Sequence, residues 1–523
     1  MARPTSLFPS STQEMQRVLR LAIISRILVL GLIIICRCIA GPYDTSASLD
    51  PPCLTKLSML DRYARKQEQT DLAHKLGKAI EATVVWDSVY YVRIAQCGYE
   101  YEQTYAFLPL LPLSMLFLSK TVLAPLIPVL GQRAVLALSG YILNNIAFVF
   151  AGLFLYKLTL LVLKDPKLAL RTVALFCFNP ASIFYSSIYS ESLFSLLSFA
   201  GIYFLLSGMN WKATLLFAMS SAVRSNGVIN AGFILFQAMH QAYEAFFRQK
   251  LVLLALQVLF VACLRSVCVF APFLFFQLYG FLNICHGESS SQGSRPWCTA
   301  NVPYLYGFVQ SHYWEVGFLR YFQLKQLPNF LLASPMLLLG ACSVIEYAVK
   351  NSWLLFSLGF KASYAERETA SIFYFVQRRK KLNEIAMRTE EFPNSAFTLS
   401  SASENVHIRK GAKMNKHTNI QAVTGVEHSN ENFSSSQMEK GLFSCLTVPF
   451  ILQLAFMIFI ACFVMHVQVA TRFLSVSPPI YWFASYFMES SQIGFKLGYI
   501  VWTVFLSYLF VGCLLFPNFY PFT

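Results

Sequence analysis

Residues 21–41 read LAIISRILVLGLIIICRCIAG, an almost unbroken apolar run. A run of about 20 apolar residues crosses the hydrocarbon core of a bilayer as a helix. Working outward along the chain, further long apolar stretches lie at about 106–130, 134–163, 172–188, 190–208, 212–238, 250–283, 327–359, 443–475 and 495–516. The sequence therefore predicts an all-α polytopic membrane protein with roughly ten spans.

The composition of the 523-residue chain agrees with that fold class. Hydrophobic residues make up 56% of it and charged residues only 13%, about half the charged share of a soluble domain. This balance excludes an ordinary soluble enzyme, a disordered scaffold and a disulfide-stapled secreted domain. The net charge of +15 falls mostly in short loops beside apolar runs, which is typical of membrane topology and not of nucleic-acid binding.

The cysteines give no sign of a metal site. The 13 cysteines include no Cys-x-x-Cys pair, so a zinc site is not expected. Several stand singly inside apolar runs, where cysteine behaves as a small hydrophobic residue: Cys36, Cys177, Cys263, Cys342, Cys462 and Cys513.

The N-terminal residues set the expected orientation. Residues 1–20 are polar and basic, which predicts a cytosolic N-terminus. The following run contains Arg26 and no small-residue cleavage site follows it, so it is interpreted as an uncleaved signal anchor and not as a signal peptide. The next segment then lies in the lumen of the secretory pathway.

The remaining organisation follows from composition. The expected parts are a membrane catalytic region 21–360 with luminal loops at about 42–105 and 284–326, a disordered cytosolic loop 361–442, and C-terminal spans in 443–523. The first luminal loop is expected to form amphipathic helices on the membrane surface. The stretch 106–130 carries Pro109, Pro112, Pro125 and Pro128, and the sequence leaves open whether it crosses the membrane or forms a re-entrant helix.

The densest polar cluster beside the membrane begins at Trp86-Asp87. At helical spacing Asp87, Tyr90 and Tyr91 share one face. A carboxylate beside aromatic rings suits a site that binds sugar and accepts a proton. The alternative is a charge at a helix N-terminus next to an aromatic interface belt.

Three further clusters place polar residues in or beside apolar runs. Asn179-Pro180 breaks a run that continues to Glu191, Arg224 and Asn226 interrupt another, and residues 313–329 mix aromatics with Arg320 and Lys325. Intramembrane ions need a cavity or a partner, and a guanidinium suits a phosphate. The alternatives are a loop between spans, an arginine that snorkels at a helix end, and an interfacial helix.

Taken together, the clusters resemble the GPI mannosyltransferase 2 family, the class-V phosphatidylinositol-glycan protein. The matching blocks are Trp86-Asp87, Ile94-Ala95, Gly98-Tyr99, Ala106-Phe107-Leu108-Pro109, Asn179-Pro180, Tyr189-Ser190-Glu191, Arg224-Ser225-Asn226-Gly227 and the stretch 313–329. One departure is that the family usually has His-Phe where this chain has Tyr90-Tyr91, so no role of that histidine is carried over.

The resemblance implies a multi-pass endoplasmic reticulum enzyme with the GT-C glycosyltransferase fold and a luminal active site. Its donor would be dolichyl-phosphate mannose, and it would add the second mannose, α-1,6-linked, to the mono-mannosylated glucosaminyl-phosphatidylinositol intermediate. Asp87 is expected to act as base in a single inverting displacement, with Arg320, Lys325 or Arg224 meeting the leaving phosphate. The remaining expected substrate-binding residues are Trp86, Tyr90, Tyr91, Tyr99, Glu102, Asn179, Glu191, Asn226, Trp314, Gln326 and Asn329.

The expected partners are the two lipid substrates, with no nucleic acid and no firm cofactor. No metal-ligand cluster is visible in the sequence, and whether the reaction needs a divalent metal or a small membrane subunit is left open. Three other functions also remain: another dolichyl-phosphate-mannose-dependent mannosyltransferase, a polytopic lipid transporter or scramblase, and a non-catalytic assembly subunit.

Overall fold

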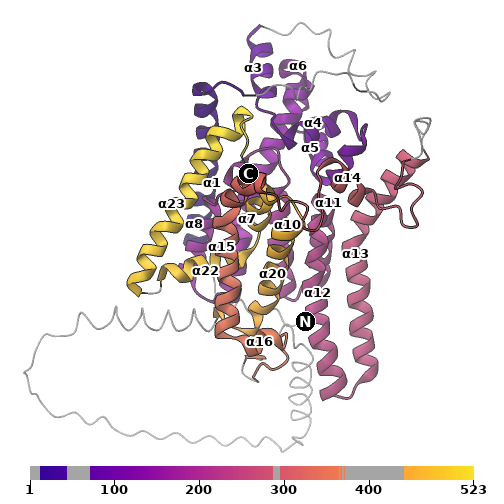
Figure 1. Cartoon of the computed structure of the whole chain (residues 1–523), viewed down its shortest axis with the longest axis vertical. Helices are drawn as coiled ribbons and strands as arrows, with labels where there is room; N and C mark the ends of the chain where they lie inside the picture. Colours follow the sequence, from indigo (N-terminus) through magenta and orange to yellow (C-terminus); the bar gives the residue numbers. More distant parts are fainter. Residues whose placement is uncertain are drawn as a thin grey trace, which may run out of the picture.

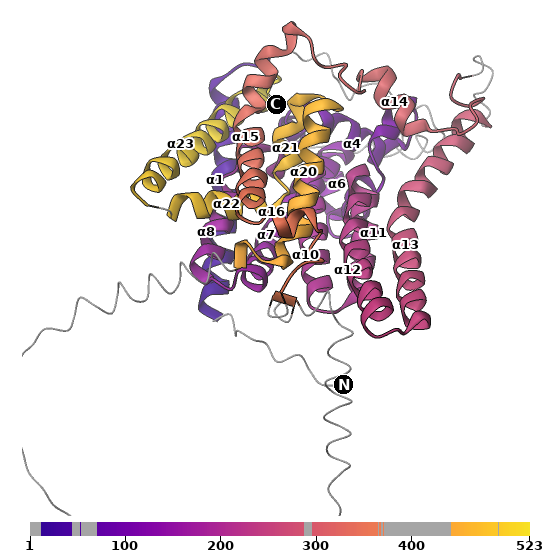
Figure 2. The same ribbon diagram turned by 60° about the horizontal axis from the view of Figure 1, so that its bottom comes forward.

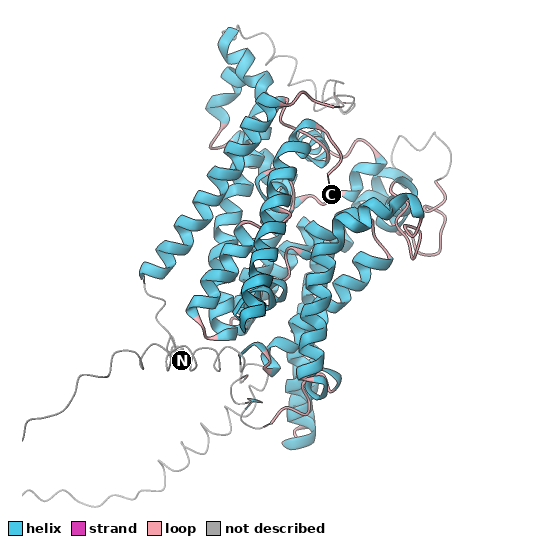
Figure 3. Cartoon of the chain, turned by 60° about the vertical axis from the view of Figure 1, so that its left-hand side comes forward, coloured by secondary structure: helices cyan, strands magenta, loops and turns pink. Residues whose placement is uncertain are grey.

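The computed structural model describes residues 12–43, 53, 71–286, 295–363, 366–367, 370, 441–489 and 491–522. Over these residues the chain forms helices and connecting loops without strands (Figure 3). The fold class predicted from the sequence, an all-α polytopic membrane protein, is confirmed. The predicted disordered loop 361–442 and much of the N-terminal segment 1–20 lie largely outside the described residues.

Six helices of the described chain are long and apolar enough to cross a membrane. They are α1 (Thr12–Ile39), α7 (Gln132–Leu163), α13 (Val252–Cys285), α15 (Leu327–Lys350), α20 (Val448–Phe463) and α23 (Ser491–Leu515). With the adjoining 3-10 turns, the spans of α15 and α20 are Leu324–Lys350 and Cys445–Phe463, and that of α23 is Lys496–Asn518. A seventh crossing is available if α5 (Leu110–Lys120) and the segment Ala124–Leu130, which contains α6 (Ile127–Leu130), form one span broken by a 72° bend. The proline-rich stretch 106–130 is therefore not a single straight helix.

The expectation of roughly ten spans does not hold by helix length, because the middle of the chain is broken into short helices. These are α8 (Pro166–Cys177), α9 (Ser182–Ser186), α10 (Glu191–Leu206), α11 (Asn210–Val223) and α12 (Ala231–Tyr243). Each is shorter than the roughly 20 residues that a span needs. Two of the breaks between them fall at Asn179-Pro180 and at Arg224, the polar interruptions in these apolar runs.

Inside the bundle, Arg26 of α1 satisfies the backbone groups that the break after α8 leaves free. Its guanidinium donates to the carbonyls of Cys177 (2.7 Å) and Ser182 (3.1 Å) and to the Ser182 and Ser186 hydroxyls (2.7 and 2.9 Å). Asn179 closes the turn, because its Oδ1 accepts from the backbone N–H of Ala181 at 2.7 Å. A helix break inside an apolar bundle is stable only where such partners exist.

The C-terminal region differs from the sequence prediction in a way that shapes the site. A span was expected to run to residue 475, but α20 ends at Phe463 and is followed by the short helices η9 (Val467–Val469) and α21 (Ala470–Leu474). The chain then returns through α22 (Pro478–Glu489), which packs against α23 and α8. Residues 464–475 therefore lie at a helix end and not inside a span.

The two predicted luminal loops gather at one end of the bundle. Helices α3 (Asp71–Glu81), α4 (Asp87–Cys97) and α14 (Leu305–Tyr313) lie there, and α16 (Ser352–Phe356) and the turn between α12 and α13 lie at the other end (Figure 1). Helix α4 packs against α5 and α7 and buries Tyr91 and Val92, so the bundle covers one of its faces. Figure 2 shows α13 at the outer edge of the bundle beside α12.

Candidate active site

Asp87 is the first residue of α4. The residue before it, Trp86, has an unusual backbone conformation. Trp86 has a φ of 53°, in the left-handed region that is unusual for a bulky residue. The indole holds this conformation, because Nε1 donates to the carbonyl of Phe516 at 3.3 Å and the ring lies 5.8 Å from that of Phe519. The backbone N–H of Asp87 donates to the Tyr189 hydroxyl at 3.1 Å. The segment after α23 and the loop between α9 and α10 thus fix where the Asp87 carboxylate lies.

Four ionised side chains of alternating sign form the charge cluster of Asp87, Arg472, Glu191 and Arg224. Asp87 Oδ2 lies 2.9 Å from Nη1 of Arg472. Nε of Arg472 lies 3.9 Å from Oε1 of Glu191, which is also ion-paired with Nη1 of Arg224. The four residues come from α4, α21, the start of α10 and the residue after α11. The sequence-predicted residues Asp87, Glu191 and Arg224 are thereby brought together.

Accessibility within the charge cluster increases from Glu191 to Asp87. The exposed fraction of the side chain is 1% for Glu191, 15% for Arg224, 17% for Arg472 and 33% for Asp87. Oε2 of Glu191 is buried and has no hydrogen-bond partner among the described residues. A buried, incompletely satisfied ionic group is costly for stability alone. The arrangement therefore points to function, with Asp87 as the carboxylate that a substrate can reach.

Two aromatic rings lie against the guanidinium of Arg472. Its guanidinium carbon lies 5.2 Å from the ring centres of both Phe184 and Tyr189, within the range of cation–π attraction. Burial lowers the pKa of Arg472, but the carboxylates of Asp87 and Glu191 raise it by more, so its pKa lies above the ordinary arginine value. The cluster therefore holds a permanent cation beside Asp87.

Aromatic side chains form a wall beside Asp87. Tyr90 stacks on Phe107 with ring centres 4.7 Å apart, and Tyr91 and Trp314 meet the same ring edge-on at 5.2 and 6.2 Å. Burial and the nearby charge of Asp87 raise the pKa of Tyr90, which keeps its hydroxyl protonated. The wall thus offers apolar ring faces and a neutral hydrogen-bond donor next to a carboxylate.

The fourth sequence cluster is joined to the chain segment that carries Arg472. Nε2 of His466 donates to the backbone carbonyl of Trp314, and the rings of His466 and Tyr321 lie 4.6 Å apart. The backbone N–H of Gly317 donates to the carbonyl of Val464 at 3.0 Å. Trp314 therefore reaches the aromatic wall through the same connection that positions α21.

Several predicted binding residues hold the scaffold. Glu102 links the two loops, because it accepts from Nε1 of Trp297 at 2.8 Å and from the Tyr313 hydroxyl at 2.9 Å. Tyr99 donates to the Phe107 carbonyl at 2.8 Å, and Asn179 belongs to the turn after α8. These contacts place the three residues in supporting positions around the charge cluster and the aromatic wall.

The remaining predicted residues lie on the loop after α14 or beside Arg224. Arg320 and Lys325 are exposed, and no described carboxylate pairs with either. Asn329 donates from Nδ2 to Oε1 of Gln326 at 2.6 Å. Oδ1 of Asn226 is buried without a hydrogen-bond partner among the described residues. Roles for these residues in substrate binding stay predictions.

Sequence reasoning missed Arg472, the residue that joins the two acids. It was hidden in the stretch 443–475, which was predicted to be a single span. The available signal was an arginine standing alone in that apolar run, since such a residue needs an anionic partner. The pairing of Asp87 with Arg472 is the principal addition that the structure makes.

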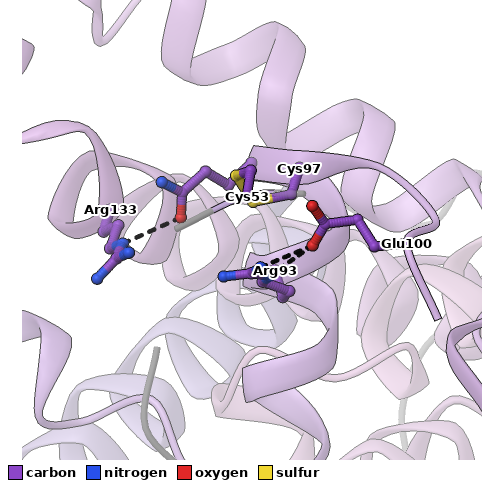
Figure 4. Close-up of a disulfide and its surroundings, with 6 residues drawn as sticks. Cys53, Arg93, Cys97, Glu100 and Arg133 are labelled. Carbon is purple, nitrogen blue, oxygen red and sulfur yellow. Dashed lines mark hydrogen bonds and ion pairs between the residues drawn. A yellow bond between two sulfur atoms is a disulfide. The ribbon is translucent and has the colours of Figure 1, made fainter. Parts of the chain in front are cut away.

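Two disulfides, which the sequence analysis did not predict, lie in the loops assigned to the lumen. Cys53 is bonded to Cys97, the last residue of α4, and Cys285 is bonded to Cys298. Beside the first disulfide, Arg93 pairs with Glu100 at 2.7 Å (Figure 4). Cys53, Cys97 and Glu100 lie close enough to share a metal ion, but both sulfurs are committed to the disulfide and the carboxylate to Arg93. The six cysteines predicted to lie singly in apolar runs are free.

Comparison with known proteins gives consistent matches. The sequence profile described as Mannosyltransferase (PIG-V) matches residues 14–523. GPI alpha-1,6-mannosyltransferase 2 of Cricetulus griseus is 34% identical over 387 residues, which cover 70% of this chain and 74% of the relative. The human protein of that name is 34% identical over 371 residues, covering 66% and 72%. GPI mannosyltransferase 2 of Drosophila melanogaster is 28% identical over 477 residues, covering 84% and 86%. No solved structure matches the chain.

The profile match includes every block on which the resemblance was based, from Trp86-Asp87 to the stretch 313–329, and it extends through Arg472. The resemblance inferred from the motifs is confirmed, and an enzyme is favoured over a transporter or scramblase. The chain belongs to the PIG-V family of mannosyltransferases.

Proposed function

We propose that the protein adds the second mannose of the GPI anchor. It transfers mannose from dolichyl-phosphate mannose to the 6-hydroxyl of the mono-mannosylated glucosaminyl-phosphatidylinositol intermediate, forming an α-1,6 bond. The observation that supports this most is the accessible Asp87 carboxylate, 2.9 Å from Arg472 and beside an aromatic wall. The relatives named GPI alpha-1,6-mannosyltransferase 2 support the choice of product.

Asp87 acts as the general base. The donor mannose is β-linked to phosphate and the product is α-linked, so one displacement with inversion suffices. As the acceptor oxygen attacks the anomeric carbon, its proton passes to Asp87. The bond between the anomeric carbon and the phosphate oxygen breaks, and dolichyl phosphate leaves with the electron pair.

Arg472 balances the charge that moves during this step. Before transfer it neutralises the Asp87 carboxylate at 2.9 Å. When Asp87 takes the proton it loses its charge, while the leaving phosphate gains one. The Arg472 guanidinium then pairs with the leaving phosphate instead of the carboxylate. Glu191, whose Oε1 lies 3.9 Å from Nε of Arg472, keeps the guanidinium in place. A preformed cation of this kind stabilises the transition state without reorganisation.

The other predicted residues bind the substrates around this centre. Tyr90, Tyr91 and Trp314 offer ring faces and edges to the sugars. Arg320 and Lys325 are exposed on the loop after α14 and bind a lipid phosphate outside the charge cluster. Arg224 supports Glu191 and is not the group that first meets the leaving phosphate. The lipid tails of donor and acceptor lie in the surrounding bilayer.

The reaction takes place on the luminal side of the endoplasmic reticulum membrane. The disulfides include Cys97 and Cys285, the last residues of α4 and α13. These helix ends lie at the end of the bundle that carries α4 (Figure 1), and disulfides persist in an oxidising compartment. This supports a luminal position for α4 and for the loop that contains α14. A small membrane subunit stays a prediction.

The test is complementation of cells that lack the second mannose step, read out as surface GPI-anchored protein and as accumulation of the one-mannose intermediate. Asp87→Asn should give no surface protein and leave the intermediate in place, whereas Asp71→Asn, an exposed acid on α3, should restore the wild-type level. Both variants must be present in the membrane at equal amounts. Full rescue by Asp87→Asn would remove Asp87 as the base.

A further inference from the structure

A second polar site lies in the bundle between α11, α12 and α13. It is a cavity of about 230 Å³ whose polar lining comprises Asn210, Gln237, Gln241, Gln257 and Arg265. These residues belong to the start of α11, the end of α12 and the first half of α13. The cavity therefore lies toward the end of the bundle where α12 turns into α13 (Figure 1).

Arg265 places a cation in this cavity without an acid to neutralise it. Its side chain is buried inside a candidate membrane span. Nε donates to the Thr214 hydroxyl at 2.9 Å and Nη2 to the Asn210 carbonyl at 3.3 Å. No carboxylate of the described residues pairs with it, and no described residue accepts from Nη1. An arginine inside a membrane normally meets an anion or a water-filled cavity.

An unsatisfied acceptor lies beside this cation. Oδ1 of Asn210 is buried and has no hydrogen-bond partner among the described residues. A buried amide oxygen without a donor is costly. A ligand that carries both an anionic group and a hydroxyl would satisfy Arg265 and Asn210 together.

The surroundings of the cavity indicate where such a ligand comes from. Gln257 and Val261, which line it, are exposed on α13. They stand among the exposed apolar residues Leu256, Phe260 and Leu264 of the same helix, a surface suited to lipid tails. The cavity is larger than the roughly 150 Å³ that holds a benzene-sized ligand and too small for a helix about 10 Å across. A lipid headgroup fits these limits.

The cavity is separate from the charge cluster. Helix α11 runs from Asn210 to Val223, and Arg224 follows directly. At about 1.5 Å per residue, its 14 residues place the two sites roughly 20 Å apart. A lipid bound here cannot meet Asp87.

We propose that this cavity is a binding site for a membrane phospholipid whose headgroup carries a phosphate and hydroxyls. Arg265 binds the phosphate, the glutamine amides surround the headgroup, and a hydroxyl donates to Oδ1 of Asn210. The acyl chains lie along the outer face of α13. The occupant is drawn from the leaflet opposite the Asp87 end.

The test uses the purified, delipidated full chain in detergent and native mass spectrometry. Phosphatidylinositol, which carries a phosphate and hydroxyls, is titrated against wild type, Arg265→Gln, Val261→Trp and Arg248→Gln. Arg265→Gln removes the cation, and Val261→Trp fills the mouth from the exposed side without disturbing the core. Arg248→Gln is the control, because Arg248 lies near the same end of the bundle and does not line the cavity.

We expect one tightly bound phosphatidylinositol on wild type and on Arg248→Gln. Its occupancy should fall on the order of tenfold in both Arg265→Gln and Val261→Trp, as expected for the loss of a charge-assisted contact. Diacylglycerol, which lacks the phosphate, should not bind at this site. Retention of phosphatidylinositol by both cavity variants would overturn the proposal, as would equal binding of diacylglycerol. If the wild-type protein binds inorganic phosphate but forms no phospholipid adduct, the proposal that the occupant is a lipid is overturned.

Discussion

Arg472 donates from Nη1 to Oδ2 of Asp87 at 2.9 Å, across 385 residues of sequence. This contact joins the start of α4 to the short helix α21 at the same end of the bundle. It converts two isolated charges beside the membrane into one pair, of which Asp87 is the more accessible member. The chemistry proposed for the protein depends on this pair separating as mannose is transferred.

Replacing Arg472 should therefore lower turnover more than donor binding. We expect Arg472→Gln to reduce kcat on the order of a hundredfold, the usual effect of removing one transition-state charge partner. Arg472→Lys should retain part of the activity, because it keeps the charge and loses the forked geometry. The measurement is steady-state transfer from dolichyl-phosphate mannose in purified membranes.

The matched control for Arg472 is Arg171→Gln. Arg171 pairs with Glu489 at 3.0 Å on a partly exposed surface, and such pairs contribute little. Its kcat should stay near wild type. An Arg472→Gln variant with unchanged kcat and a raised KM alone would assign Arg472 to substrate binding only.

Glu191 should be a stability residue as well as a positioning residue. Glu191→Gln leaves Arg224 beside a site of 1% exposure without its acid, whereas Arg472 keeps Asp87. We therefore expect about 3–5 kcal/mol lower stability. The double variant Glu191→Gln, Arg224→Gln removes one uncompensated charge and should regain part of that loss. Thermal unfolding of the purified variants measures both effects, and additive losses would contradict a coupled pair.

Transfer is expected to proceed without a divalent metal. Asp87 and Glu191 are each paired with an arginine, so the charge of each carboxylate is already balanced by a guanidinium. We expect activity in excess EDTA to equal that in buffer containing magnesium or manganese. Loss of activity in EDTA that added magnesium or manganese restores would contradict the assignment of charge balance to Arg472.

Breaking the Cys53–Cys97 disulfide should destabilise the end of the bundle that carries Asp87. The bond joins residues 44 apart in sequence and ends on the last residue of α4, and closing a loop of this length contributes about 3–4 kcal/mol. Cys97→Ser should lower the unfolding temperature and reduce transfer. Cys263→Ser, a free cysteine of α13, is the control and should change neither.

The same cysteines test the orientation of the chain. A maleimide that does not cross membranes should fail to label Cys53 and Cys97 from the cytosolic side of sealed microsomes. After the membranes are opened and the disulfide is reduced, both should react. Labelling from the cytosolic side after reduction alone would place Asp87 on the wrong side for the proposed reaction.

Local sequence determined the class of the fold and many of the residues at its site. Apolar runs such as 21–41 and 250–283 are long enough to force helices through a bilayer, since a bilayer offers no other partner to the backbone. Asn179-Pro180 and Arg224 marked two of the breaks in the middle of the chain, although Pro272 and Arg265 lie inside the unbroken helix α13. Ordered motifs from Trp86-Asp87 onward pointed to the family before any contact was known.

Tertiary structure alone decided which charges meet. The stretch 443–475 has the composition of a span, yet α20 stops at Phe463, where the following residues bond to Trp314 and Gly317 of a distant loop. That stop brings Arg472 to Asp87 and Glu191. Pairings across hundreds of residues leave no trace in local periodicity, because they depend on the shape of the folded bundle and on the cost of leaving a buried ion without its partner.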